Sequence, residues 1–179
     1  MNKMRISKVI KKYPNGKTQQ LEYRVNGLLH NPTYMVNNED DYLRVPKLNT
    51  DQVVPNNNKI VYALTTYYES GSIESVTDYY QNKKHGVSKW FYKLGGVQCE
   101  TYWFNNGLHR EPLNGKPQPA VIEWFGSGAL RSKSYWIKDM YAPGIQVGNK
   151  SPFFVEYDIK GNIIKMSGYD IEGKIVILK

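Results

Sequence analysis

Polar and apolar residues alternate along much of this chain, in short runs that turn residues interrupt. The segments 122–124 and 130–136 both show this period of two. A period of two places successive side chains on opposite faces of an extended backbone and is typical of β-strands. No stretch of ten residues has helical periodicity. The pattern therefore predicts an all-β protein.

The runs belong to a repeating unit that has the chemistry of a β-hairpin. Each unit has an aromatic pair, two further residues, a glycine, an alternating segment, a second aromatic pair and a polar turn. Turn dipeptides such as Asn15-Gly16 and Lys160-Gly161 favour hairpins, because glycine readily takes a positive φ. The five units cover residues 13–32, 67–86, 91–110, 124–143 and 157–174.

The repeat predicts the architecture of the whole chain. We expect an antiparallel meander of about five hairpins that forms one elongated, twisted sheet. Residues 1–32 form a basic N-terminal hairpin in this scheme, and residues 59–179 form the main array. Residues 33–58 are acidic and rich in Asn and Pro, which predicts an irregular insertion. The glycines that align the units are Gly16, Gly71, Gly95, Gly128 and Gly161.

The composition narrows the class of protein further. The chain of 179 residues has one cysteine, which excludes an intramolecular disulfide framework and a four-cysteine zinc site. No apolar run approaches the roughly 20 residues that span a bilayer. The basic start, residues 1–12, lacks the apolar segment of a secretory signal. We therefore expect an intracellular, cytoplasmic protein that is neither secreted nor transmembrane.

The net charge of +8 is concentrated near the N-terminus. Residues 1–24 contain seven Lys or Arg and one Glu, which gives this segment a net charge of +6. Such a hairpin either keeps the protein soluble or binds a polyanion, namely nucleic acid or an acidic phospholipid membrane. The residues that would bind the polyanion are Lys8, Lys11, Lys12, Lys17 and Arg24.

No residue pattern points to catalysis, a metal or a cofactor. His30, His85 and His109 each follow a turn glycine by fourteen residues, so equivalent positions in adjacent hairpins lie about 10 Å apart. Ligands of one zinc ion lie about 2 Å from it, so we interpret the histidines as turn residues bonded to local backbone. Cys99 lies in the middle of a predicted strand, and no sequence motif of a catalytic cysteine surrounds it. Residues 126–128 lack the ending of a phosphate-binding loop and fit a hairpin turn. We expect a non-enzymatic protein without a small-molecule substrate.

The aromatic content of 13% is the feature most closely tied to function. Adjacent aromatic residues in a strand point to opposite faces, so pairs such as Tyr79-Tyr80 and Tyr102-Trp103 predict aromatic ladders on both sides of the sheet. The ladders stabilise a single-layer sheet by roughly 0.2–1 kcal/mol for each cross-strand pair. They also offer a binding face, because Tyr and Trp are enriched at interface hot spots. The candidate partner-binding residues are Tyr68, Tyr80, Trp90, Tyr92, Trp103, Trp124 and Trp136.

Five parts of the unit at 67–86 form a recognisable phrase: Tyr67-Tyr68, Gly71, Ile73, Tyr79-Tyr80 and His85-Gly86. The phrase resembles the MORN repeat, and especially its MORN-variant form. The segments 108–110 and 119–122 are similar to the L-H-R…G-P-A-V-I phrase of such units in large DNA viruses, although residues 113–118 are inserted here. Similar units occur in bacterial antitoxin-like proteins. The resemblance implies a β-hairpin array with an interaction role.

Two functions follow as expectations. The first is a non-enzymatic repeat scaffold for protein–protein interaction, either a viral accessory or virion-associated protein in host cytoplasm or virion, or an antitoxin-like binder. The second is polyanion binding through the basic N-terminal hairpin. Strand edges at the two ends of the array would also allow self-association by edge pairing.

Overall fold

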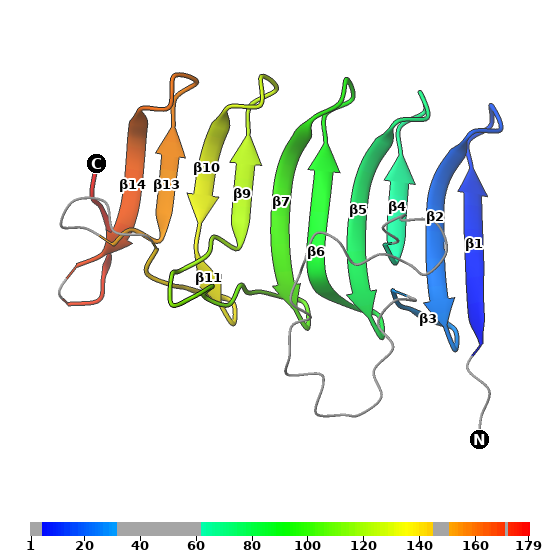
Figure 1. Cartoon of the computed structure of the whole chain (residues 1–179), viewed down its shortest axis with the longest axis horizontal. Helices are drawn as coiled ribbons and strands as arrows, with labels where there is room; N and C mark the ends of the chain where they lie inside the picture. The colour runs from blue at the N-terminus through cyan, green and yellow to red at the C-terminus, as the bar shows by residue number, and fades with distance from the viewer. Residues whose placement is uncertain (1–4, 32–61, 145–150, 171) are drawn as a thin grey trace. The chain divides into compact units, whose positions relative to one another are not determined.

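The computed structural model describes residues 5–31, 62–144, 151–170 and 172–179. The predicted insertion at 33–58 lies outside these residues. The chain divides into two compact units, residues 1–88 and 89–179, and each is treated separately below. The described residues are organised into strands and turns without a helix (Figure 1), so they offer no apolar helix of membrane-spanning length.

The first unit is an antiparallel meander in the order β1-β2-β4-β5-β6. Its short β3 pairs with β2, and β6 continues for three residues into the second unit. Pairing between β1 and β2 is in continuous register from Ile6↔Val25 to Lys11↔Gln20. The strands are β1 (Ile6–Lys12), β2 (Thr18–Val25), β3 (Leu28–Leu29), β4 (Leu64–Tyr67), β5 (Ile73–Tyr80) and β6 (Lys83–Phe91).

The second unit repeats the same plan in the order β7-β9-β10-β13-β14-β15. Strand β8 pairs with β7, while β11 and β12 form a separate two-stranded ribbon. The prediction of an all-β antiparallel meander built from hairpins is confirmed. The strands are β7 (Val97–Phe104), β8 (Gly107–Leu108), β9 (Val121–Trp124), β10 (Leu130–Ser134), β11 (Trp136–Ile137), β12 (Met140–Tyr141), β13 (Phe154–Tyr157), β14 (Ile163–Tyr169) and β15 (Ile175–Ile177).

Within each unit, the turns with an aligned glycine lie at one end of the strands (Figure 1). In the turn after β6, Gly95 N–H donates to the Tyr92 carbonyl over 2.9 Å, and Tyr92 N–H donates to the Gly96 carbonyl over 3.1 Å. The glycine has a φ of +101°, which side chains resist. The same pair of hydrogen bonds closes the other four predicted glycine turns and a sixth, unpredicted turn at 170–174.

At the other end of the strands are two-residue turns in which both residues have positive φ. Such type I′ turns match the twist of the flanking strands. They correct the predicted alignment of the second aromatic pair between units. Counting back from these turns, Tyr79 is equivalent to Trp103, and buried Asp78 takes the position of Tyr102. The turns are Asn26-Gly27, Gln81-Asn82, Asn105-Asn106 and Lys138-Asp139.

The buried positions hold many small side chains. Ala63 and Ser88 in the first unit and Ala120 in the second are fully buried. The Thr66 and Ser75 hydroxyls bond one another across β4 and β5 at 2.7 Å, whereas the buried Ser88 hydroxyl has no hydrogen-bond partner among the described residues. Large buried apolar side chains are correspondingly few among the described residues: Val76, Tyr80 and Val87 in the first unit, and Tyr135, Phe153, Val155 and Met166 in the second.

Candidate functional site

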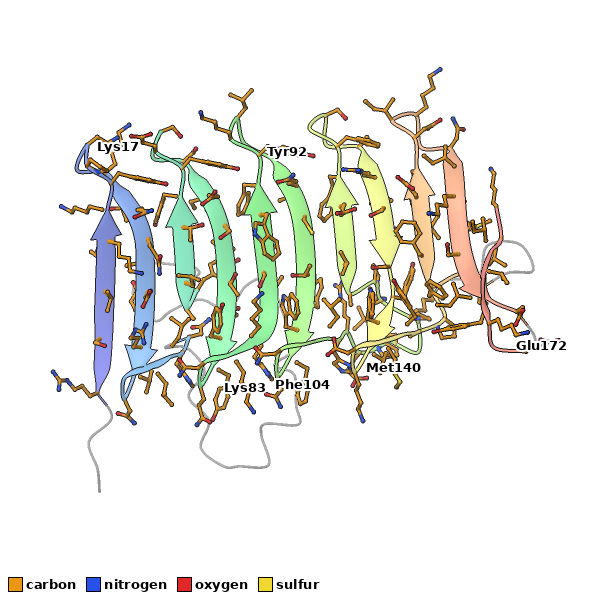
Figure 2. The ribbon with its side chains drawn as sticks, turned by 180° about the vertical axis from the view of Figure 1, so that it is seen from behind. Lys17, Lys83, Tyr92, Phe104, Met140 and Glu172 are labelled. Carbon is orange, nitrogen blue, oxygen red and sulfur yellow. The ribbon has the colours of Figure 1, made fainter. Side chains whose placement is uncertain are left out.

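Tyr92 is half-buried and acts as a link between neighbouring glycine turns. Its hydroxyl donates a 2.7 Å hydrogen bond to the Trp124 carbonyl, just before the next glycine turn of the second unit. Tyr13 does the same in the first unit, donating to the Tyr67 carbonyl over 2.7 Å. Figure 2 shows Tyr92 at the glycine-turn end and Phe104 at the other end. Tyr68 holds the equivalent position and is also half-buried.

Three other aromatic candidates have structural contacts of their own. The indole N–H of Trp103 donates to the Thr101 hydroxyl over 2.7 Å, and that of Trp136 donates to the Ser134 hydroxyl over 2.8 Å. Each bond joins a residue to the one two positions earlier, on the same face of the strand. Tyr80 is buried, and the centre of its ring lies 4.8 Å from that of His30.

The two remaining candidates, Trp90 and Trp124, are brought together. They line one pocket of about 320 Å³, which lies wholly within the second unit. The wall also includes a thiol, a hydroxyl, a carboxylate and a guanidinium, from Cys99, Thr101, Glu123 and Arg131. We call this site the tryptophan pocket.

Glu123 provides the negative charge of the tryptophan pocket. Register places it directly opposite Cys99 on β7 and Ser132 on β10, so the three side chains share a face. The Ser132 hydroxyl donates to Glu123 Oε2 over 2.7 Å. Within the described residues Glu123 makes no ion pair, and it is only partly exposed. Arg131 is exposed, and its Cζ lies 6.0 Å from the centre of the Phe125 ring.

The Cys99 thiol in this pocket is held in its protonated form. Burial, together with the smaller effects of the negative charges of Glu123 and Glu100, raises its pKa to about 11. A thiol with this pKa is a poor nucleophile near neutral pH, because the thiolate is the reactive species. The position agrees with the interpretation of Cys99 as a structural residue.

The three histidines are buried, and two of them bond the backbone of the following hairpin. Gln81 N–H donates to His30 Nδ1 over 3.4 Å, and Lys138 N–H donates to His109 Nδ1 over 3.1 Å. The prediction that the histidines bond local backbone is corrected for these two, because the backbone donor lies in the following hairpin, 51 residues after His30 and 29 residues after His109. On the other side of its ring, His109 Nε2 lies 2.9 Å from Glu111 Oε1.

The basic residues of the first hairpin do not converge on one surface. Lys8 and Lys12 are exposed and share one face of β1, while Lys11 lies on the other face, 3.8 Å from Glu22. The Arg24 guanidinium also binds Glu22, at 2.6 Å. Lys17, at the turn in Figure 2, donates from Nζ to the Ser70 carbonyl over 2.9 Å.

Some important residues carry no clear signal in the sequence. Glu123 and Arg131 are ordinary charged residues of strands, and only the pairing of β7, β9 and β10 brings them to the tryptophans. Asp78 is buried and accepts a 2.6 Å hydrogen bond from the Asn31 amide, 47 residues earlier. Asp78 occupies the position that Tyr102 holds in the next unit. This replacement of an aromatic residue by an acid was the sequence signal for Asp78.

Comparisons with protein-family models, with curated proteins and with solved structures find no match for this chain.

Proposed function

We propose that this protein is a non-enzymatic repeat scaffold that binds a protein partner through the tryptophan pocket. The observation that carries the proposal is the convergence of Trp90 and Trp124 on one pocket beside Arg131. Trp is among the residue types most enriched at interface hot spots, which cluster in pockets that a partner fills and desolvates. The hairpin repeat also supports kinship with MORN-variant arrays.

The chemistry of the pocket favours binding over nucleophilic catalysis. With the pKa of Cys99 raised to about 11, on the order of one thiol in ten thousand is ionised at pH 7. The pocket combines indole surfaces with a hydroxyl and two opposite charges. These groups provide the mixture of apolar contact and directed polar contact that protein interfaces use.

Polyanion binding is the second candidate, and Lys8 and Lys12 support it because both are exposed on one face. The other three basic candidates already bind acceptors, since Lys11 and Arg24 contact Glu22 and Lys17 bonds a carbonyl. Two exposed ammonium groups give a weak electrostatic site at physiological salt. The tryptophan pocket is therefore the better supported site.

The test is affinity capture from source-cell extract with the full chain, its Trp90→Ala variant and a Leu94→Ala control. Leu94 is fully exposed at the tip of a glycine turn and is absent from the pocket wall. We expect one stoichiometric protein partner with the wild type and Leu94→Ala, and its loss with Trp90→Ala. Thermal unfolding of each bait checks that the variants are folded.

The proposal is overturned if folded Trp90→Ala and Trp124→Ala baits both retain the partner. It is also overturned if the wild type captures only nucleic acid or lipid. In that case, loss of binding in Lys8→Ala/Lys12→Ala and a steep dependence on salt would support the polyanion function.

A further inference from the structure

The Glu123 carboxylate is positioned to bind a positive group in the tryptophan pocket. Its Oε2 accepts the Ser132 hydroxyl hydrogen, and the fixed serine holds the carboxylate in one orientation. A carboxylate has about four acceptor sites, so most of its capacity stays available after one hydrogen bond. Within the described part of the chain it lacks a cationic partner.

A second acid lies on the same face of the second unit. Ser132 is directly opposite Glu123 on one side and Glu156 on the other. Directly paired residues share a face, so both carboxylates flank Ser132 on the side of the sheet that Cys99 also faces. Glu156 is itself opposite Lys165 on β14. Of the two acids, Glu123 is the one that lines the tryptophan pocket, so it is the carboxylate that an incoming cation would meet there.

The cation of Arg131 lies in the pocket wall without neutralising Glu123. Its side chain is exposed, whereas that of Glu123 is only partly exposed. The two do not form an ion pair, and the guanidinium carbon lies 6.0 Å from the Phe125 ring centre. Exposed charges are screened by water and salt more than buried ones. The partly buried carboxylate therefore determines the sign of the charge that the pocket prefers.

We infer that the tryptophan pocket binds the guanidinium group of an arginine side chain presented by the protein partner. The inference rests on the proposed function and adds the chemistry of the partner. A guanidinium is planar, stacks on an aromatic face and fits a carboxylate with two parallel N–H donors. The pocket contains both the indole surfaces and the carboxylate. An arginine fits this combination better than a lysine, which is a compact and strongly hydrated point charge.

The probe is an acetylated, amidated pentapeptide with one arginine between glycine and serine residues. Its control replaces arginine with citrulline, which has nearly the same shape without the charge. Binding to the ¹⁵N-labelled full chain is followed through the indole N–H resonances of Trp90 and Trp124. We expect the arginine peptide to shift both resonances with a dissociation constant in the millimolar range, and the citrulline peptide to bind at least about tenfold more weakly.

Two variants test the source of the effect, and Glu100→Gln is the matched control. Glu100 is adjacent to Cys99 on β7, so it lies on the opposite face, where it binds Lys89 at 3.2 Å. Glu123→Gln should weaken the arginine peptide about tenfold or more, whereas Glu100→Gln should leave its affinity unchanged. Arg131→Ala should strengthen binding about twofold to threefold, because it removes a like charge.

Equal binding of the arginine and citrulline peptides would reject the inference, as would full affinity in a folded Glu123→Gln variant. Preferential binding of a matched glutamate peptide, dependent on Arg131, would show an anion site and also reject it. Partner capture that requires Trp90 while these tests fail would leave the proposed scaffold function intact. Failure of capture itself would count against the proposed function instead.

Discussion

The hydroxyl of Tyr92 donates a 2.7 Å hydrogen bond to the backbone carbonyl of Trp124, 32 residues later in the chain. The bond ties the turn of one hairpin to the last strand residue before the next turn. Because Trp124 also lines the tryptophan pocket, a residue that maintains the repeat also fixes part of the candidate site. Tyr13 and Tyr67 have the same relationship in the first unit.

Tyr92→Phe should destabilise the protein by about 1 kcal/mol, since the half-buried Trp124 carbonyl loses its side-chain donor while the ring remains. Tyr13→Phe should have an effect of similar size, because its hydroxyl has the equivalent partner. Urea-induced unfolding measures both losses as free energies of unfolding.

Tyr141→Phe is the matched control for these two variants. The Tyr141 ring stacks on Phe153 with ring centres 4.1 Å apart, and this contact does not need the hydroxyl. Loss of the Tyr141 hydroxyl should change the free energy of unfolding by less than about 0.5 kcal/mol. Equal effects at Tyr92 and Tyr141 would show that the turn-to-turn bond contributes nothing.

The turn between β9 and β10 contains two glycines with different requirements. Gly128 has a φ of +85°, whereas Gly126 is outside the positive-φ region, and an added Cβ would meet no atom within 4 Å at either position. Gly128→Ala should therefore destabilise the protein by about 1–2 kcal/mol through backbone strain alone. Gly126→Ala should be neutral or slightly stabilising. Thermal and urea unfolding of the pair would contradict this account if the two substitutions had equal effects.

The periodicity and the turn glycines were enough to predict the hairpin meander, because both are local properties of the sequence. Gly16, Gly71, Gly95, Gly128 and Gly161 all adopt the positive φ that their turns require. The sixth turn at 170–174 also has a glycine, Gly173, with the same hydrogen bonds. It follows the fifth glycine turn so closely that the single predicted unit at 157–174 contained both turns.

The candidate site was predictable only in part, because pairing between strands decides which side chains meet. Trp90 and Trp124 belong to the predicted aromatic set and do line a common pocket. Tyr92 and Trp103 belong to the same predicted aromatic set, yet their side chains donate hydrogen bonds to other residues of the repeat. Glu123 had no signal at all, since its position opposite Cys99 depends on the register of β7 and β9.

Asp158 should make the last units of the repeat sensitive to acid. Hydrogen bonds from the Asn162 side chain and backbone N–H, and from the backbone N–H groups of Lys160 and Gly161, hold the pKa of the carboxyl below its ordinary value. A lowered folded-state pKa gives stability that is present above the unfolded-state value and is lost as the pH falls through the folded-state value.

We expect carboxyl ¹³C NMR titration to find the pKa of Asp158 below 3.8. Asn162→Ala removes the largest cause of the shift, so it should raise this pKa toward the ordinary value. Lys160→Ala keeps the backbone donor and serves as the control. An unchanged Asp158 titration in Asn162→Ala would contradict the assignment of the cause.

Cys99 should report on the charge of Glu123. Burial, with Glu123 and Glu100 adding to it, raises the pKa of the thiol from 9.0 to about 11. Iodoacetamide should therefore react slowly at pH 8, with a rate that rises to half its maximum near pH 11. A raised folded-state pKa also makes stability fall as the pH rises from 9 through 11, since the unfolded thiol ionises first.

Glu123→Gln removes one of the two negative neighbours and should lower the pKa of Cys99, so alkylation at pH 8 becomes faster. Glu100→Gln should act in the same direction with a smaller effect, because Glu123 is the larger of the two charge contributions. The rate measured over pH 8–11 in native protein separates this effect from unfolding, which would expose the thiol in every variant. An alkylation midpoint near 8.5 in the native protein would show that Cys99 is neither desolvated nor close to these carboxylates.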